Sequence, residues 1–287
     1  MKKDLTIVKV GTGVISNGKR TRLDTRAINS IGKDIASIEG LTSLNQRAKR
    51  LEHEGSLILV TSGAVTAGKQ KLGLDRKVFR DVRMKQTAAM IGNNLLFKLW
   101  EDATGILVGS DLLTQNDLTD REHWDNLSGV VANNLKYGVL NAFNEGDARS
   151  TEELQRKINS NGREYKRFGD NDQLASKLAI QLGNFAMSFV SQPTRVIFLT
   201  DTDGVRQDVK NTESRFKQLH SDELNEVILN CIETEGISNG GMLSKMLAAK
   251  DLTANGINVS IGYGKEEHAL RRLYDYEDYG THILANN

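Results

Sequence analysis

Two lysines stand in surroundings that are unusual for an ammonium group. Lys9 interrupts the apolar run Thr6-Ile-Val-Lys-Val-Gly11, and Lys245 lies one turn into a predicted helix that follows Gly240 and Gly241. Burial removes the hydration of an ammonium group, so such a lysine is costly unless an anion meets it. An edge strand would instead leave Lys9 in water, and a solvated helix face would do the same for Lys245. We therefore treat both lysines as candidates for binding an anion, with these ordinary explanations still open.

Glycines cluster where three of the predicted elements begin or end. Glycine lets backbone N–H groups approach a phosphate closely, and the start of a helix adds a partial positive charge. A simple turn is the more ordinary explanation for any single loop, but three such loops, two of them beside lysines, favour a phosphorylated ligand. The glycines concerned are Gly11, Gly13, Gly63, Gly240 and Gly241.

Two segments have the Gly-x4-Gly-Lys spacing of a P-loop, namely residues 13–20 and 63–70. A P-loop continues with Ser or Thr, because that hydroxyl group holds the magnesium ion. Arg20 and Gln70 occupy this position here, and neither side chain supplies a hydroxyl group. We therefore interpret both segments as chance matches.

Three polar turns carry the acidic residues best suited to organise such a site, at residues 144–147, 169–172 and 200–204. Their ordinary roles are side-chain-stabilised turns and helix caps. Their functional role would be to orient a lysine, a substrate amine or a magnesium–nucleotide complex. Asp172 is placed to cap its helix and to hold two lysines. Phosphoryl transfer requires mainly positioning and positive charge around the transferred group, which two lysines, backbone donors and one carboxylate would supply.

The composition narrows the class of protein. The chain has 287 residues and a formal net charge of +1, so we expect no bulk electrostatic attraction to nucleic acid. No apolar run approaches the roughly 20 residues of a membrane span, and the start lacks the apolar stretch of a signal peptide. We expect a cytoplasmic protein with neither a membrane nor a nucleic-acid partner.

Residues that often make metal or nucleophilic sites are sparse. A single cysteine, Cys231, excludes a disulfide framework and a cysteine-based zinc site. The five histidines show no ligand spacing, and no serine has an evident histidine and acid partner. We therefore predict no resident metal site and no hydrolase triad.

Predicted strands and helices alternate along the chain, which is typical of a mostly parallel sheet covered by helices. Ligands bind such sheets beyond the carboxyl ends of the strands. Asn161-Gly162 is a strong hairpin signal, so we predict a β-hairpin inserted at residues 154–168. The predicted strands cover residues 5–10, 57–60, 106–113, 139–143, 195–199 and 258–261. The predicted helices cover residues 24–38, 41–54, 78–100, 127–137, 172–189, 223–232 and 241–255.

Seven motifs, in one order, give the chain a resemblance to the amino-acid kinase superfamily and, within it, to the glutamate 5-kinase branch. The resemblance runs from about Lys9 to Thr281. The motifs are Val8-Lys-Val-Gly-Thr12, Leu59-Val-Thr-Ser-Gly-Ala-Val65, Lys85-Gln-Thr-Ala-Ala-Met-Ile-Gly92, Asp111-Leu-Leu-Thr114, Phe168-Gly-Asp-Asn-Asp-Gln-Leu-Ala175, Leu199-Thr-Asp-Thr-Asp-Gly-Val205 and Gly240-Gly-Met-Leu-Ser-Lys245.

The resemblance implies a three-layer αβα sandwich with a mainly parallel central sheet of about eight strands. Residues 1–287 would form one kinase domain, with a substrate lobe at about 1–165 and a nucleotide lobe at about 166–287. No C-terminal RNA-binding-like domain is expected. The resemblance further implies ATP and Mg²⁺ as cofactors and assembly as a homo-oligomer, either a dimer or a tetramer.

The same resemblance assigns roles to individual residues. Lys9 and Lys245 would neutralise the transferred phosphoryl group, and Asp172 would organise both lysines. The acceptor would be bound by Ser62, Gly63, Asp147 and Asn171. The nucleotide would be bound by Lys9, Gly11, Thr200, Asp201, Asn239, Gly240, Gly241, Met242, Leu243, Ser244 and Lys245.

The implied reaction is ATP-dependent phosphorylation of the γ-carboxylate of L-glutamate, in proline biosynthesis. The chain has Gly146 where the family has asparagine in the substrate loop. This difference leaves open a phosphotransferase of the same family that acts on another small carboxylate or phosphate acceptor. A second alternative, independent of Gly146, is a non-catalytic regulator that binds a nucleotide or an amino acid.

Overall fold

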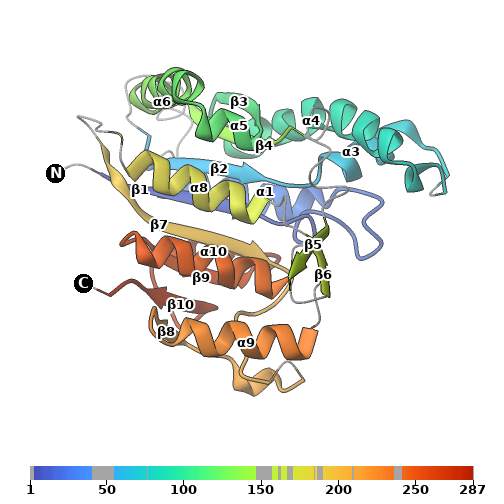
Figure 1. The fold of residues 1–287 in the computed structure, drawn as a ribbon. Helices are drawn as coiled ribbons and strands as arrows, with labels where there is room; N and C mark the ends of the chain where they lie inside the picture. The colour runs from blue at the N-terminus through green and yellow to red at the C-terminus, as the bar shows by residue number, and fades with distance from the viewer. Residues whose placement is uncertain are drawn as a thin grey trace.

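An eight-stranded β-sheet is the central element of the computed structural model, which describes residues 3–40, 55–75, 77–146, 157–160, 163–166, 171–183, 185, 190–208, 210–235 and 241–286. Its order is β3-β4-β2-β1-β7-β9-β10-β8 (Figure 1). Neighbours from β3 to β9 run parallel, β10 is antiparallel to β9, and β8 is parallel to β10. The predicted sheet is confirmed. The strands are Lys3–Val10 (β1), Leu57–Thr61 (β2), Val108–Leu113 (β3), Leu140–Glu145 (β4), Val190–Thr200 (β7), Gln218–His220 (β8), Asn258–Tyr263 (β9) and Thr281–Leu284 (β10).

Helices cover both faces of this sheet, so the predicted three-layer αβα architecture is confirmed. One face packs against α6, α8, α9 and α10, and the other packs against α1, α3, α4 and α11. These helices are Thr25–Ile38 (α1), Ala64–Leu72 (α3), Val82–Thr104 (α4), Arg121–Lys136 (α6), Asn171–Gly183 (α8), Leu224–Glu235 (α9), Met242–Ala254 (α10) and Ala269–Tyr274 (α11); Gln115–Thr119 (α5) is a shorter helix before α6.

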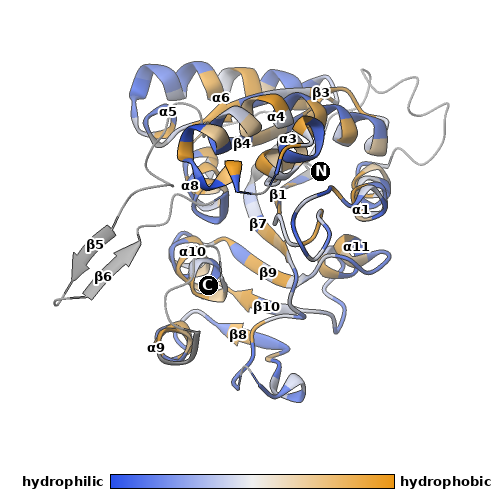
Figure 2. Cartoon of the chain, turned by 90° about the vertical axis from the view of Figure 1, so that its right-hand side faces the viewer, coloured by the Kyte–Doolittle hydropathy of each residue, from blue (hydrophilic) through white to orange (hydrophobic). Residues whose placement is uncertain are grey.

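The alternation of side chains along β1 decides which layer each residue faces. Leu5 and Ile7 belong to the core shared with α8 and α10, whereas Val8 and Val10 belong to the core shared with α1 and α4. In Figure 2 the strands β9 and β10 are mainly hydrophobic in colour, while the helices carry both hydrophobic and hydrophilic turns. Lys9 continues the odd-numbered series of β1, so its side chain lies on the side of α8 and α10.

The start of α1 follows directly from the sequence. The side chain of Asp24 accepts hydrogen bonds from the backbone N–H groups of Arg26 and Ala27, which caps the helix. Three isoleucines spaced by three and four residues, Ile28, Ile31 and Ile35, are about 1% exposed. The prediction of this amphipathic helix is therefore confirmed.

Three helix predictions were wrong in their bounds. The predicted helix 127–137 begins six residues earlier, because Asp120 caps α6 at Arg121. The predicted helix 78–100 is divided into the 3₁₀ turn Val78–Arg80 (η2) and α4, because Asp81 is extended and its side chain caps the N–H group of Met84. The predicted helix 172–189 is shorter than expected, since α8 ends at Gly183 and Phe185 is no longer helical.

Helix α3 was not predicted, because its glycines were interpreted as belonging to a loop. Gly68 and Gly92 lie where α3 crosses α4, and neither position has room for a side chain. A Cβ atom on Gly68 would lie 1.8 Å from the carbonyl oxygen of Ala88, and one on Gly92 would lie 1.9 Å from that of Ala64. Gly68 is therefore required by the close approach of two helix backbones.

The predicted hairpin is present as two antiparallel strands, Lys157–Ser160 (β5) and Arg163–Lys166 (β6). The turn residues Asn161 and Gly162 lie outside the described residues. The predicted helix 41–54 also lies outside them.

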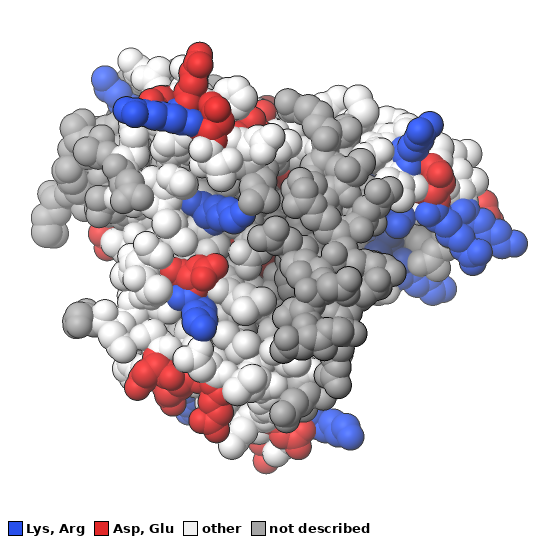
Figure 3. Space-filling model, viewed as in Figure 1, with Lys and Arg blue, Asp and Glu red and all other residues white. Residues whose placement is uncertain are grey.

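The surface of the described residues carries charges of both signs. Acidic and basic side chains are interspersed on the face shown in Figure 3, in keeping with a formal net charge of +1. None of the described helices combines the length and the apolar character that crossing a membrane requires.

Candidate active site

The carboxyl ends of β4, β2, β1 and β7 lie side by side, because these four strands are consecutive and parallel. Two backbone hydrogen bonds fix the residues that follow the central strands. Gly11 N–H donates to the carbonyl group of Leu199, and Ser62 N–H donates to that of Val10, each at 3.0 Å. The candidate residues that follow β1, β2 and β7 therefore meet at one edge, where parallel sheets bind ligands.

A buried cluster of one carboxylate and two ammonium groups lies near this edge. The Nζ atom of Lys9 is 2.5 Å from Oδ1 of Asp172, and the Nζ atom of Lys245 is 3.1 Å from Oδ2 of the same carboxylate. Lys9 comes from β1, Asp172 from the first turn of α8, and Lys245 from the first turn of α10. All three residues are at most 3% exposed. The fold thus brings together the three residues expected to be catalytic.

The carboxyl group of Asp172 stays ionised at neutral pH. Its complete burial would raise its pKa, but the charges of Lys9 and Lys245 and their hydrogen bonds outweigh that effect and lower the pKa to about 2. The cluster therefore places two lysine side chains and one ionised carboxylate where water is excluded. Lysine side chains in such surroundings are suited to an anionic ligand.

A chain of buried polar side chains lies next to the cluster. Asn171 Nδ2 donates to Ser62 Oγ and to Asn144 Oδ1, both at 2.9 Å, and Asn144 Nδ2 donates to Asn93 Oδ1 at 2.8 Å. Ser62 and Asn171, both expected at the acceptor site, are therefore in contact. Gly63 follows Ser62 and precedes α3 with a left-handed φ of 104°, a conformation that favours glycine.

Asn93 and Asn144 are members of this chain that the sequence analysis did not assign to the site. Asn93 lies in the middle of α4, between the buried residues Ala89 and Trp100. A helix places residues 89, 93, 96 and 100 on one face. This periodicity was the available signal, because an amide on an otherwise apolar face needs a buried partner.

The carboxylate of Asp201 packs against the loop that follows β1. A Cβ atom on Gly13 would lie 2.4 Å from Asp201 Oδ2, so a side chain at position 13 would displace this carboxylate. Thr200 is buried, and its hydroxyl group donates to Asp201 Oδ1 at 3.4 Å. Arg20 lies 3.8 Å from Asp201. Gly11, Thr200 and Asp201 thus share this end of β1 and β7.

Helix α10 begins at Met242, with Gly241 as its N-cap residue. Because glycine has no capping side chain, the first backbone N–H groups of α10 remain suited to an anion. Leu243 and Ser244 are buried beside Lys245. Three other expected site residues, Asp147, Asn239 and Gly240, lie outside the described residues.

The donor set of the cluster is suited to anions and not to a resident metal ion, because Lys9 and Lys245 repel divalent cations. Within the described ranges, no group of three or more His, Cys, Asp or Glu side chains could hold a metal ion.

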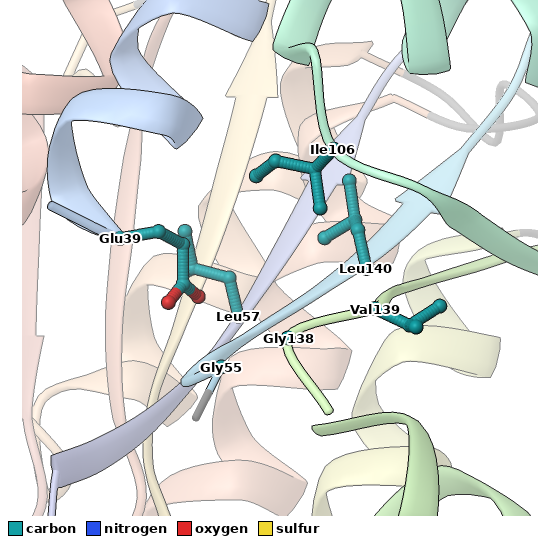
Figure 4. Close-up of a pocket in the computed structure, with 7 residues that line it drawn as sticks. All are labelled: Glu39, Gly55, Leu57, Ile106, Gly138, Val139 and Leu140. Atoms are coloured by element: carbon teal, nitrogen blue, oxygen red, sulfur yellow. The ribbon is translucent and has the colours of Figure 1, made fainter. Parts of the chain in front are cut away.

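A separate pocket lies at the opposite end of the strands (Figure 4). Leu57 and Leu140, the first residues of β2 and β4, line it together with Ile106. Glu39 at the end of α1 also lines it and accepts a hydrogen bond from Ser56 N–H at 2.8 Å. The lysine cluster is not part of this pocket.

Comparison with known sequences places relatives along nearly the whole chain. The sequence pattern of the Amino acid kinase family matches residues 4–263. "Glutamate 5-kinase" of Syntrophus aciditrophicus is 31% identical over 94% of this chain and 66% of its own length. "Glutamate 5-kinase" of Syntrophotalea carbinolica is 30% identical over 99% of this chain and 70% of its own length. The chain thus spans about two thirds of the length of these relatives.

Solved structures share the fold at low sequence identity. A carbamate kinase from Giardia lamblia, bound to AMP-PNP, has a TM-score of 0.60 at 14% identity, with 99% of each chain covered. A UMP kinase from Bacillus anthracis has a TM-score of 0.57 at 15% identity, covering 100% of this chain and 98% of its own.

Proposed function

The chain belongs to the amino acid kinase family, and we propose that it uses ATP to phosphorylate the γ-carboxylate of L-glutamate, the first step of proline biosynthesis. The observation that carries this proposal is the buried Lys9–Asp172–Lys245 cluster at the carboxyl edge of the sheet. It occurs in a chain that aligns over 94–99% of its length with relatives named glutamate 5-kinase.

In this reaction, a γ-carboxylate oxygen of glutamate bonds to the γ-phosphorus of ATP. The bond from that phosphorus to the oxygen bridging the β and γ groups breaks, and ADP leaves with the electron pair. The attacking carboxylate has an ordinary pKa of about 4.3, so it is ionised at neutral pH and needs no general base. Catalysis then rests on alignment and on charge stabilisation.

Lys9 and Lys245 supply the charge stabilisation in this proposal. Both ammonium groups lie within 3.1 Å of Asp172, so their positions are set before the substrate arrives. Fixed charges in a site without water act more strongly than the same charges in solution. Asp172 is a positioning residue for both lysines and takes no part in proton transfer, because its low pKa keeps it ionised.

We assign the remaining site residues by lobe. Residues of about 1–165 contribute Ser62, Gly63 and Asp147 to the acceptor site, and Asn171 completes it from the start of α8. Residues of about 166–287 bind the nucleotide. This set consists of Thr200, Asp201 and residues 239–245, joined by Lys9 and Gly11 from β1.

Magnesium enters this proposal as part of the MgATP substrate, held by the phosphate oxygens. The lysine cluster favours phosphate groups and not a free cation, which supports entry of magnesium together with the nucleotide. The proposal also includes assembly as a homo-oligomer, which light scattering of the purified chain would test.

One feature bears on the alternative of another acceptor. A Cβ atom on Gly146 would point toward Thr114, at 3.1 Å from its Cγ2 atom. Thr114 follows β3, so a side chain at position 146 would meet this neighbour. The substrate test below distinguishes the two acceptors.

The test is ADP release from MgATP with and without L-glutamate, with hydroxylamine to trap the acyl phosphate. We expect ADP that depends on glutamate and an equal amount of hydroxamate. Turnover only with another small acid would identify the alternative acceptor. ATP binding without any turnover would identify a non-catalytic regulator.

A further inference from the structure

Four buried side chains from four separate elements form one hydrogen-bonded chain. In order they are Asn93 of α4, Asn144 of β4, Asn171 of α8, and Ser62 after β2, joined at 2.8, 2.9 and 2.9 Å. All four residues are at most 8% exposed. Buried amides are normally satisfied by fixed partners, so each amide in this chain has one orientation set by its neighbours.

A backbone N–H group determines the direction of the whole chain. Glu145 N–H donates to Asn144 Oδ1 at 2.9 Å, and a backbone N–H group can only donate. Asn144 Oδ1 is therefore the acceptor, and Asn144 Nδ2 must donate. Asn93 meets that donor with its carbonyl oxygen, which anchors the amide of Asn144 from the other side.

The consequence reaches the amide of Asn171. Its Nδ2 group has two N–H donors, and both are used, one by Asn144 Oδ1 and one by Ser62 Oγ. Its carbonyl oxygen is buried and has no hydrogen-bond partner among the residues that the structure describes. Asn171 directly precedes Asp172 in α8, and its partner Ser62 is hydrogen-bonded to Val10, the residue after Lys9. A buried acceptor of this kind is suited to an N–H donor of a ligand.

We propose that Asn93 is a positioning residue for the acceptor substrate: through Asn144 it fixes Asn171 with its carbonyl oxygen toward the α-ammonium group of glutamate. This inference rests on the proposed function. Glutamate carries one N–H donor group, its α-ammonium, whereas its two carboxylates only accept. The Asn171 oxygen would therefore distinguish glutamate from an acid of the same length without an amine.

The crossing of α3 and α4 explains how Asn93 reaches Asn144. Gly92 directly precedes Asn93, and the missing side chains of Gly92 and Gly68 let α4 lie close against α3. Asn93 then faces the interior, 4% exposed, below the end of β4. Another buried polar residue of α4, Thr104 at its C-terminal end, forms hydrogen bonds among the described residues only to its own helix and to the turn that follows, so it provides a matched control.

The first experiment compares Asn93→Leu, Asn93→Asp and Thr104→Val with the wild type, using L-glutamate and glutarate as acceptors. Losing a hydrogen bond to a charged group costs about tenfold in affinity. We expect Asn93→Leu to raise KM for glutamate by about tenfold and to lower the preference for glutamate over glutarate by about the same factor, with KM for ATP unchanged. Asn93→Asp keeps an acceptor and should retain most of the preference. Thr104→Val should retain all of it.

An unchanged KM for glutamate and an unchanged preference in a folded Asn93→Leu variant would overturn the proposal. An equal rise in KM for ATP would also overturn it, because it would indicate a general loss of structure. Asn93→Asp provides a second variant if Asn93→Leu does not fold.

A measurement on the wild type separates this inference from the proposed function. Selective ¹⁵N labelling of asparagine allows the side-chain amide protons of Asn171 to be followed by NMR during exchange into D₂O. We expect both protons to exchange slowly, because both donate to buried acceptors. Fast exchange of either proton would overturn the inference, whether or not glutamate is a substrate. Slow exchange without glutamate turnover would instead refute the proposed function, and with it glutamate as the ligand of Asn171, while the hydrogen-bonded chain itself would stand.

Discussion

Replacing Asp172 by asparagine removes the charge of the carboxylate and keeps its shape. Lys9 and Lys245, both about 3% exposed, would then lie buried without the Asp172 carboxylate that contacts them both. Two ammonium groups of like charge destabilise a water-free site, so we expect the variant to be less stable than the wild type.

The size of this loss follows from the structure in two ways. The lowering of the pKa of Asp172 from 3.8 to about 2 corresponds to roughly 2–3 kcal/mol of folding free energy. Breaking a buried ion pair by removing one partner costs about 3–5 kcal/mol. We therefore expect a loss of about 2–5 kcal/mol, or a fall in Tm of roughly 5–15 °C.

The assay is thermal unfolding of the wild type and Asp172→Asn, with and without inorganic tripolyphosphate. The polyphosphate replaces the negative charge that the two lysines lose with the Asp172 carboxylate, so it should raise the Tm of the variant more than that of the wild type. Asp278→Asn is the matched control. Asp278 also bonds two cations, Arg215 and Lys217, but its side chain is 55% exposed, and water screens the pair. We expect its Tm to be unchanged.

The stabilisation by Asp172 should depend on pH. Because the pKa of Asp172 is lower in the folded chain, its stabilisation is present above about pH 4 and is lost as the pH falls toward 2. The difference in Tm between wild type and variant should shrink over the same interval. Two results would refute this role of Asp172. One is a Tm for Asp172→Asn equal to that of the wild type at pH 7, and the other is an equal rise in Tm of both proteins with polyphosphate.

Other side chains give further tests. Lys245→Met should lower kcat by about 10²–10³-fold, as expected for losing one fixed charge at the transferred group. The control is Lys98→Met, which changes an exposed lysine. Equal kcat values for Lys245→Met and Lys98→Met would contradict the role of Lys245. Gly92→Ala places a methyl group 1.9 Å from a backbone oxygen, so it should lower Tm by several degrees, whereas Gly129→Ala in α6 meets nothing within 4 Å and should not lower it. Burial lowers the pKa of His282, so protonation below its ordinary pKa of about 6.5 favours the unfolded chain. The Tm of the wild type should fall from pH 7 to 5, and His282→Gln should reduce this fall. An equal fall in the Tm of both proteins would exclude His282 as its cause.

The sequence predicted the parts of the fold that local pattern controls. Period-two alternation placed Lys9 on the face opposite Val8 and Val10, and the structure confirms this. The isoleucine spacing predicted α1 to within one residue. Such features depend on neighbours in the chain, so their patterns are visible in the sequence.

Features that depend on contacts between distant parts of the chain could not be predicted from local sequence patterns. Gly68 stands inside α3 because the backbone of α4 lies against it, and the sequence alone gave the segment the pattern of a glycine loop. Asn93 was missed for a similar reason, since its partner comes from β4. Short strands such as β8 and β10 contain too few residues for an alternation to stand out.

The pairing of β1 with β7 affects how the chain reaches its active form. β1 is synthesised first, but one of its two neighbours, β7, begins at Val190, and Lys245 follows later still. Contacts between distant parts of a chain form slowly, because a large loop must close before they stabilise anything. A nascent chain that ends before Val190 therefore carries Lys9 on a strand with one edge uncovered. The charged cluster is completed only after most of the chain has left the ribosome, so its anion-binding capacity is a late product of folding.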